Sequence, residues 1–263
     1  TRGDPGTTSE AQVLAANVDV VFVVHPIAED PNLRRIEREL TLAWDSGAVP
    51  VVVLTKADLS RDPGAALAAV EAIALGVEVL KVNALDGESA AQLLSHLAGH
   101  RSGVLIGPSG AGKSTLTNAL LGEERQATRD IRAKDGRGRH TTVARELIRV
   151  GDVGVVIDTP GLRAIGLTGS EAGIEAAFPD IEELAASCRF RDCSHTSEPE
   201  CAVLAAVEEE SLGSDRLASY HKLVREAQVA AMKTDVRLRG EEQRKWKLIS
   251  KSVKQLYKRK GRG

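Results

Sequence analysis

Residues 103–121 read GVLIGPSGAGKSTLTNALL, and this stretch indicates the fold more clearly than any other part of the chain. Its centre, residues 107–114, matches the pattern G-x-x-x-x-G-K-[ST] between an expected strand at 103–106 and an expected helix at 113–121. In that setting the glycines let backbone N–H groups turn inward around phosphates, the lysine reaches the β- and γ-phosphate oxygens, and the serine hydroxyl binds Mg²⁺. The residues expected to hold the phosphates are Gly107, Ser109, Gly110, Ala111, Gly112, Lys113, Ser114 and Thr115.

Hydrophobic stretches alternate with amphipathic ones on both sides of this pattern. Residues 18–24 (VDVVFVV) are rich in β-branched side chains and do not alternate with polar ones, which is typical of a strand buried on both faces of a parallel sheet. Repeated strand and helix units predict a doubly wound, mostly parallel α/β domain over residues 1–168, followed by a mainly helical domain over 169–263. Further strands are expected at 49–54, 77–82, 146–150 and 153–158, and further helices at 32–44, 64–75 and 89–97.

The phosphate-loop pattern alone leaves kinases, ATPases and GTPases open, and a second motif narrows the choice. Residues 155–161 (VVIDTPG) are an expected hydrophobic strand that ends in D-x-x-G. Asp158 can hold Mg²⁺ through a water molecule, and the amide of Gly161 can sense the γ-phosphate. An ordinary Pro-Gly turn is the alternative, but the position of this motif shortly after the phosphate loop favours nucleotide binding.

The choice of base is expected to come from residues 55–58 (TKAD), which directly follow a strand. The carboxylate of Asp58 can accept both the N1 and the N2 hydrogens of guanine, whereas adenine has no such pair of donors. Lys56 can lie along the base and ribose, and after the next strand Asn83 and Ala84 can bring the Ala84 amide to guanine O6. Both segments precede the phosphate loop, so the elements of a GTPase occur in circularly permuted order. All of these loops still meet at the carboxyl edge of one sheet, where open α/β sheets bind ligands.

All three cysteines lie within residues 188–201, together with one histidine. The spacing Cys188-x4-Cys193-x-His195-x5-Cys201 suits a tetrahedral zinc site, whose four protein ligands leave no open position and therefore indicate a structural role. The odd number of cysteines and the absence of a signal-peptide pattern at the start argue against a disulfide framework. We expect one structural Zn²⁺ and a cytoplasmic protein.

Taken in order, these motifs closely resemble those of the bacterial RsgA (YjeQ) ribosome-associated GTPases. The resemblance also includes residues 15–19 (AANVD), 138–142 (GRHTT) and 158–162 (DTPGL), and it covers nearly the whole chain. It implies GTP or GDP with Mg²⁺ as ligands, and GTP hydrolysis stimulated by the small ribosomal subunit and its rRNA during late maturation of that subunit.

The chain departs from the family pattern in two ways. Family members usually have Asn where Thr55 stands, so guanine binding is expected to be weaker, and they usually carry an N-terminal OB-fold barrel for which this chain has no residues.

The Gly-rich segment 129–142 is expected to be the first switch region. Thr141 or Thr142 would supply a hydroxyl to Mg²⁺ and the γ-phosphate, and we assign this role to Thr142. Leu162 follows the D-x-x-G motif, so the glutamine that orients water in Ras-like enzymes is absent. His140 is the best local candidate to place the attacking water because its ring can titrate and form hydrogen bonds. The resemblance supports this role, and a loop histidine that packs or binds RNA is the alternative.

The net charge of −2 over 263 residues hides an asymmetry. Residues 216–263 contain 15 Lys or Arg against 4 Asp or Glu, a balance of +11, whereas residues 1–215 have a balance of −13. The run 237–262 has an apolar face and a basic face at helical spacing, which favours contact with a polyanion; the alternative is a solvated helix. Its apolar residues are Trp246, Ile249, Val253, Leu256 and Tyr257.

No apolar run approaches the length of roughly 20 residues that a membrane span needs, so we expect no membrane contact, and we expect a monomer. Two other functions are weighed. A P-loop kinase for a small molecule would make the TKAD segment accidental. An RNA-binding scaffold that needs no nucleotide would have no use for Lys113 and Asp158.

Overall fold

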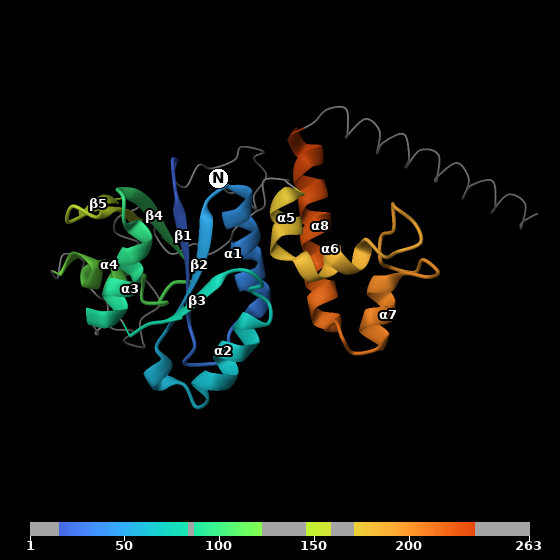
Figure 1. The fold of residues 1–263 in the computed structure, drawn as a ribbon, viewed down its shortest axis with the longest axis horizontal. Coiled ribbons are helices and arrows are strands. Elements are labelled where there is room, and N and C mark those ends of the chain that lie inside the picture. Colours follow the sequence, from blue (N-terminus) through green and yellow to red (C-terminus); the bar gives the residue numbers. More distant parts are fainter. Residues whose placement is uncertain (1–15, 84–86, 123–145, 159–170, 235–263) are drawn as a thin grey trace, which may run out of the picture.

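The computed structural model describes residues 16–83, 87–122, 146–158 and 171–234, and its centre is a six-stranded sheet (Figure 1). The strand order is β3-β2-β1-β4-β6-β5, and every neighbouring pair is parallel except β5 and β6, which are antiparallel. This arrangement confirms the predicted, mostly parallel, doubly wound sheet. The strands are β1 (Val20–Pro26), β2 (Val49–Thr55), β3 (Glu78–Lys81), β4 (Arg101–Ile106), β5 (Glu146–Val150) and β6 (Gly154–Asp158).

Helices cover both faces of the sheet, which explains why its central strands are apolar on both sides. One face packs against α1 and α2, and the other packs against α3 and α4. Within β1, for example, Val21 and Val23 point to the first face, whereas Phe22 and Val24 point to the second. The helices are α1 (Leu33–Asp45), α2 (Pro63–Glu71), α3 (Gly87–Leu97) and α4 (Lys113–Leu121).

The predicted helix at 64–75 is shorter in the structure, where α2 ends at Glu71. The N–H groups of Ile73 and Ala74 both donate to the carbonyl of Val70, and Gly76 has a positive φ of 71°. The backbone therefore closes a tight turn before β3. The other predicted strands and helices up to residue 158 lie within a few residues of their expected positions.

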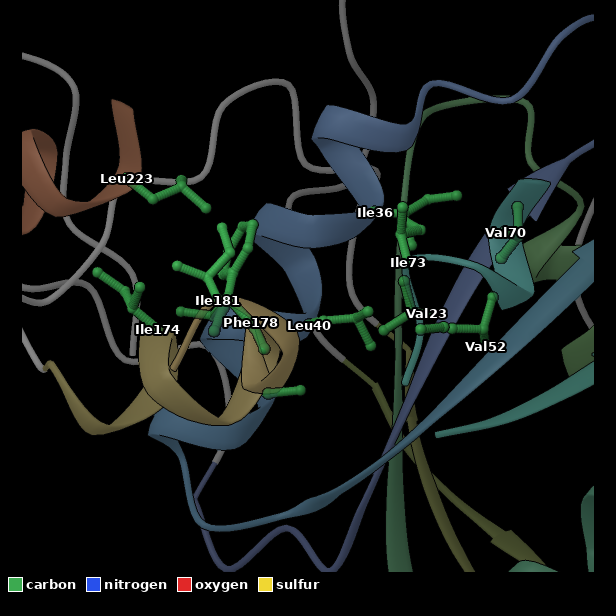
Figure 2. Packing of buried hydrophobic residues seen from close by; sticks show 14 of the residues in the cluster. Val23, Ile36, Leu40, Val52, Val70, Ile73, Ile174, Phe178, Ile181 and Leu223 are labelled. Atoms are coloured by element: carbon green, nitrogen blue, oxygen red, sulfur yellow. The ribbon is translucent and has the colours of Figure 1, made fainter. Parts of the chain in front are cut away.

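Within residues 171–234, four helices follow the sheet and lie on the outer side of α1 (Figure 1). In Figure 2, Ile174, Phe178 and Ile181 lie beside Leu40 of α1, and all four residues belong to the same buried cluster as Val23 and Val52 of the sheet. The predicted boundary near residue 169 falls outside the described residues, but the helices beyond it share a hydrophobic core with the sheet. They are α5 (Ala172–Ala177), α6 (Pro179–Ala185), α7 (Ala202–Glu208) and α8 (Ser214–Thr234).

The crossing of α1 and α5 is so close that it requires a glycine. A Cβ atom on Gly173 would lie 2.6 Å from the carbonyl oxygen of Thr41 and 2.8 Å from Cβ of Asp45. These distances are shorter than van der Waals contact, and the first neighbour is backbone, which cannot move aside. Gly173 therefore sets how near the C-terminal helices approach α1.

One buried and one half-buried ion pair also join α8 to α1. Arg216 of α8 donates to Glu37 of α1 at 2.9 Å and to Asp180 of α6 at 2.8 Å, and its guanidinium lies 4.1 Å from the ring centre of Phe178. Arg38 of α1 forms a bidentate pair with Glu226 of α8, with distances of 2.5 and 2.7 Å. Polar and apolar contacts thus hold α8 against α1 at several points.

None of the helices in the described part of the chain has the length and apolar character of a membrane-spanning segment.

Candidate functional site

The phosphate-loop residues form a tight turn between β4 and α4, at the carboxyl edge of the parallel strands. Gly107 has a φ of 141°, and a Cβ atom there would lie 2.1 Å from the carbonyl oxygen of Val24 in β1. Gly112 caps α4 with a φ of 93°, a left-handed conformation that favours glycine. The glycines at both ends of the loop are therefore needed for the shape of the backbone and for its contact with β1.

Lys113 points back into this loop. Its side chain is buried, and Nζ donates to the carbonyls of Gly107 at 3.0 Å and Pro108 at 2.8 Å. The ammonium group therefore lies where the loop closes. Because Gly112 has no side chain, no side chain caps the first turn of α4, which contains Ser114 and Thr115. Backbone N–H groups at such a helix start, together with a lysine inside the loop, are suited to bind phosphate.

The segment predicted to read the base follows β2 at the same edge of the sheet. Lys56 has a φ of 58°, and Ala57–Leu59 form one turn of 3₁₀ helix that carries Asp58 with its side chain exposed. The neighbouring strand β3 leads to Asn83, whose N–H donates to Ser89 Oγ at 3.0 Å. Since β2 and β3 are parallel neighbours, Asp58 and Asn83 follow strands that end side by side.

Thr55 links the base segment to the phosphate loop, a role that the sequence reasoning missed. Its hydroxyl is buried and donates to the carbonyl of Ala111 at 2.7 Å. The family that the sequence resembles usually has Asn at this position, which predicts weaker guanine binding. In the structure the Thr side chain joins the two loops, and the weaker guanine binding stays a prediction. The signal available in the sequence was only that a polar residue ends an otherwise apolar strand.

Several predicted site residues lie outside the described part of the chain. These are Ala84, His140, Thr141, Thr142 and Gly161, together with the basic run 237–262. Asp158 is the last residue of β6 and pairs with Leu105 of β4, which places its backbone near the start of the phosphate loop.

The predicted cysteine and histidine cluster comes together between α6 and α7. The Sγ atoms of Cys188 and Cys201 are 3.8 Å apart, and Nδ1 of His195 lies 3.7 Å from the first and 3.4 Å from the second. One ligand atom from each of these residues and from Cys193 lies within 4.8 Å of the others. Ligands of a tetrahedral zinc ion, with Zn–S of about 2.3 Å and Zn–N of about 2.0 Å, are roughly 3.5–3.8 Å apart. The cluster therefore has the composition and the size that zinc requires.

Burial has opposite consequences for the histidine and for one cysteine of this cluster as metal ligands. Burial lowers the pKa of His195, which favours the neutral imidazole, the form that can offer a ring-nitrogen lone pair to a cation. Burial also raises the pKa of the Cys193 thiol to about 11, so a bound cation must displace that proton. Glu198 holds the loop around His195 by accepting hydrogen bonds from Ser194, Thr196 and Ser197, and these bonds keep the pKa of Glu198 well below its usual value.

Comparison with known families agrees with this geometry. The sequence profile of the RsgA GTPase family matches residues 3–168, and a profile described as 50S ribosome-binding GTPase matches residues 102–256. A Streptomyces avermitilis protein named small ribosomal subunit biogenesis GTPase RsgA is 52% identical over 94% of this chain and 67% of its own length. A Listeria monocytogenes protein named small ribosomal subunit biogenesis GTPase RsgA 1 is 43% identical over 95% of this chain and 72% of its own length.

Solved structures lead to the same family. YjeQ from Thermotoga maritima is similar with a TM-score of 0.60 and 29% identity, over 80% of this chain and 72% of that one. YloQ, described as a circularly permuted GTPase, is similar with a TM-score of 0.60 and 28% identity, over 81% of this chain and 69% of that one. Of the functions weighed from the sequence, these matches select GTP hydrolysis over small-molecule phosphorylation and over RNA binding without a nucleotide. The chain belongs to the RsgA GTPase family and is a GTP hydrolase with a circularly permuted fold, which implies that it binds a guanine nucleotide with Mg²⁺.

Proposed function

We propose that this GTPase is stimulated by the small ribosomal subunit and acts in the late maturation of that subunit, in the cytoplasm. The observation that carries the proposal is the identity of 43–52% over nearly the whole chain with proteins named for small ribosomal subunit biogenesis. The basic balance of residues 216–263 supports contact with rRNA, because Lys and Arg bind the phosphate backbone without reading sequence. The monomeric state stays a prediction.

For hydrolysis, the chain's own residues have distinct proposed roles. Lys113 neutralises charge on the β- and γ-phosphates, the backbone amides of residues 107–115 hold the phosphate oxygens, and the amide of Gly161 senses the γ-phosphate. Ser114 and Thr142 would hold Mg²⁺, with Asp158 acting through water, and the ion supplies charge neutralisation between the two phosphates. The geometry of Lys113, inside a loop closed by glycines, supports its part of this assignment.

Water positioning is assigned to His140. Leu162 can neither donate nor accept a hydrogen bond from its side chain, so it cannot orient a water molecule. We infer that the isolated protein hydrolyses GTP slowly and that the ribosomal subunit brings His140 to the attacking water.

This function predicts the behaviour of a GTPase assay with and without purified small ribosomal subunits. The subunit should raise the rate of phosphate release. Replacing His140→Ala should remove most of that stimulation, about 10²-fold or more if the ring acts in proton transfer, and leave GTP affinity nearly unchanged. His96→Ala, on α3, is the matched control and should be stimulated like the wild type. If the His140 variant is stimulated as strongly as the wild type, another group positions the attacking water. If the subunit does not stimulate the wild type, the proposed ribosome-dependent function is wrong.

Guanine specificity is assigned to Asp58, with Thr55, Lys56, Asn83 and Ala84 completing the base site. Asp58→Asn should weaken GDP binding and reduce discrimination against xanthosine diphosphate, because an amide cannot accept both base protons. Calorimetric titration with the two nucleotides measures both effects. Unchanged GDP affinity in the variant would show that Asp58 does not bind the base.

We also propose that Cys188, Cys193, His195 and Cys201 hold one structural zinc ion. The distances among three of these ligand atoms, 3.4 to 3.8 Å, support the assignment. The loop between α6 and α7 contains no helix or strand, so metal ligation would supply much of its stability.

The zinc proposal predicts about one zinc per purified chain by elemental analysis. Cys193→Ser should lose the metal, and amide exchange should accelerate in residues 186–208 while β1, β2 and β4 stay protected. Ser194→Ala, one residue away and not a ligand, should keep the metal. A zinc-free wild type, or a Cys193 variant with unchanged exchange, would contradict a structural zinc site.

A further inference from the structure

Helix α1 carries a second buried carboxylate, Glu39, that faces the sheet and has no role in the chemistry described above. Its side chain has no exposed surface, and both of its oxygens are engaged. Nε2 of His25 in β1 donates to one oxygen at 2.6 Å, and Nε of Arg35 donates to the other at 2.9 Å. We call Arg35, Glu39 and His25 the β1 clamp, because they fasten the carboxyl end of β1 to the helix that covers it.

The carboxyl end of β1 is also where the two loops of the nucleotide site rest. Gly107 of the phosphate loop lies against the carbonyl of Val24, so closely that even one methyl group would not fit. Thr55 lies against the next carbonyl, that of His25, with its Oγ1 at 3.4 Å. The carbonyl of Thr55 in turn accepts a hydrogen bond from the N–H of Ile27 at 2.9 Å.

The ring of His25 points away from the site itself. Side chains alternate along a strand, so His25 shares a face with Val21 and Val23, which pack against α1. Its backbone, by contrast, lies under the base segment. A displacement of the His25 ring can therefore affect a bound nucleotide only if it also moves the backbone of β1.

We propose that the β1 clamp positions the guanine nucleotide site: by fixing the end of β1 from the α1 side, it sets the distance between the phosphate loop and the base segment. Glu39 and His25 are then positioning residues, not catalytic ones. The inference rests on the assignment of residues 107–115 and 55–58 to nucleotide binding. Because a preorganised site binds its ligand more tightly than a mobile one, a loosened β1 should weaken nucleotide binding measurably.

The same helix supplies a matched control. Glu37 is also buried, and it is also paired with an arginine, but that partner is Arg216 of α8 at 2.9 Å, and a second partner is Ser219 of α8. Its carboxylate thus binds the C-terminal helices, whereas that of Glu39 binds β1. A change at Glu37 removes a buried charge from α1 without touching the strand under the nucleotide site.

The test compares GDP dissociation constants of the wild type, Glu39→Gln and Glu37→Gln by calorimetry. All three proteins are measured at a temperature where circular dichroism shows them folded. We expect Glu39→Gln to bind GDP about tenfold more weakly and Glu37→Gln to stay within about twofold of the wild type. Equal losses in both variants, or no loss in Glu39→Gln, would overturn the inference. A wild type that does not bind GDP would instead reject the nucleotide site itself.

A second pair of variants decides the matter if Glu39→Gln does not fold. His25→Gln keeps a side-chain donor that can reach Glu39, whereas His25→Leu keeps bulk and loses the donor. The first should retain GDP affinity within about threefold, and the second should lose about tenfold. Equal affinities in the two His25 variants would contradict a positioning role for the hydrogen bond.

Discussion

Helix α1 is enclosed between the sheet and the C-terminal helices, and this enclosure is the constraint on which the rest of the structure depends. From Ile36 to Ala43 only Arg38 is not buried. The enclosed stretch includes two carboxylates, which cannot lose their hydration without new partners. Glu37 is compensated by Arg216 of α8, and Glu39 by Arg35 and His25. Removing one member of such a buried pair typically costs about 3–5 kcal/mol, so both sides of α1 are fixed in place.

This arrangement gives the C-terminal helices a role beyond carrying the cysteine cluster. Gly173 permits α5 to lie directly on the backbone of α1, and the same apolar cluster extends from Val23 of β1 to Leu223 of α8. The chain between Asp158 and α5 contains the D-T-P-G motif, so a segment expected to respond to the γ-phosphate is joined at both ends to elements that pack around this core. A partner bound to the C-terminal helices would therefore act on a body that includes the strands beneath the proposed nucleotide site.

Much of the fold could be predicted from local sequence. The apolar runs at residues 18–24 and 49–54 are too continuous for a half-exposed strand, and the phosphate loop sits between a strand and a helix as its chemistry demands. The cysteine cluster was equally clear, because its four residues are close in sequence, and the structure brings their ligand atoms together. Such features are encoded within short segments, so no knowledge of distant contacts is needed.

The features that could not be predicted are contacts between residues far apart in the sequence. Glu37 and Glu39 are charged residues of an amphipathic helix, and charged residues are ordinarily exposed. Their burial follows from Arg216, which is 179 residues beyond Glu37, and from His25 in β1. Gly173 gives no sign in the sequence that a helix crosses it, and the link from Thr55 to Ala111 joins positions 56 residues apart. Tertiary packing, not local propensity, decides each of these contacts.

The central claim is that α1 joins the C-terminal helices and the GTPase sheet into one folding unit. Hydrogen exchange followed by mass spectrometry, with and without saturating GDP, tests it under conditions where β1 exchanges only through global unfolding. A ligand that binds the folded state slows exchange throughout every region that unfolds together with its site. The account predicts that GDP slows exchange in α5 and α8 by the same factor as in β1. Slowing in β1 with no change in α5 and α8 would show two independent units and contradict it.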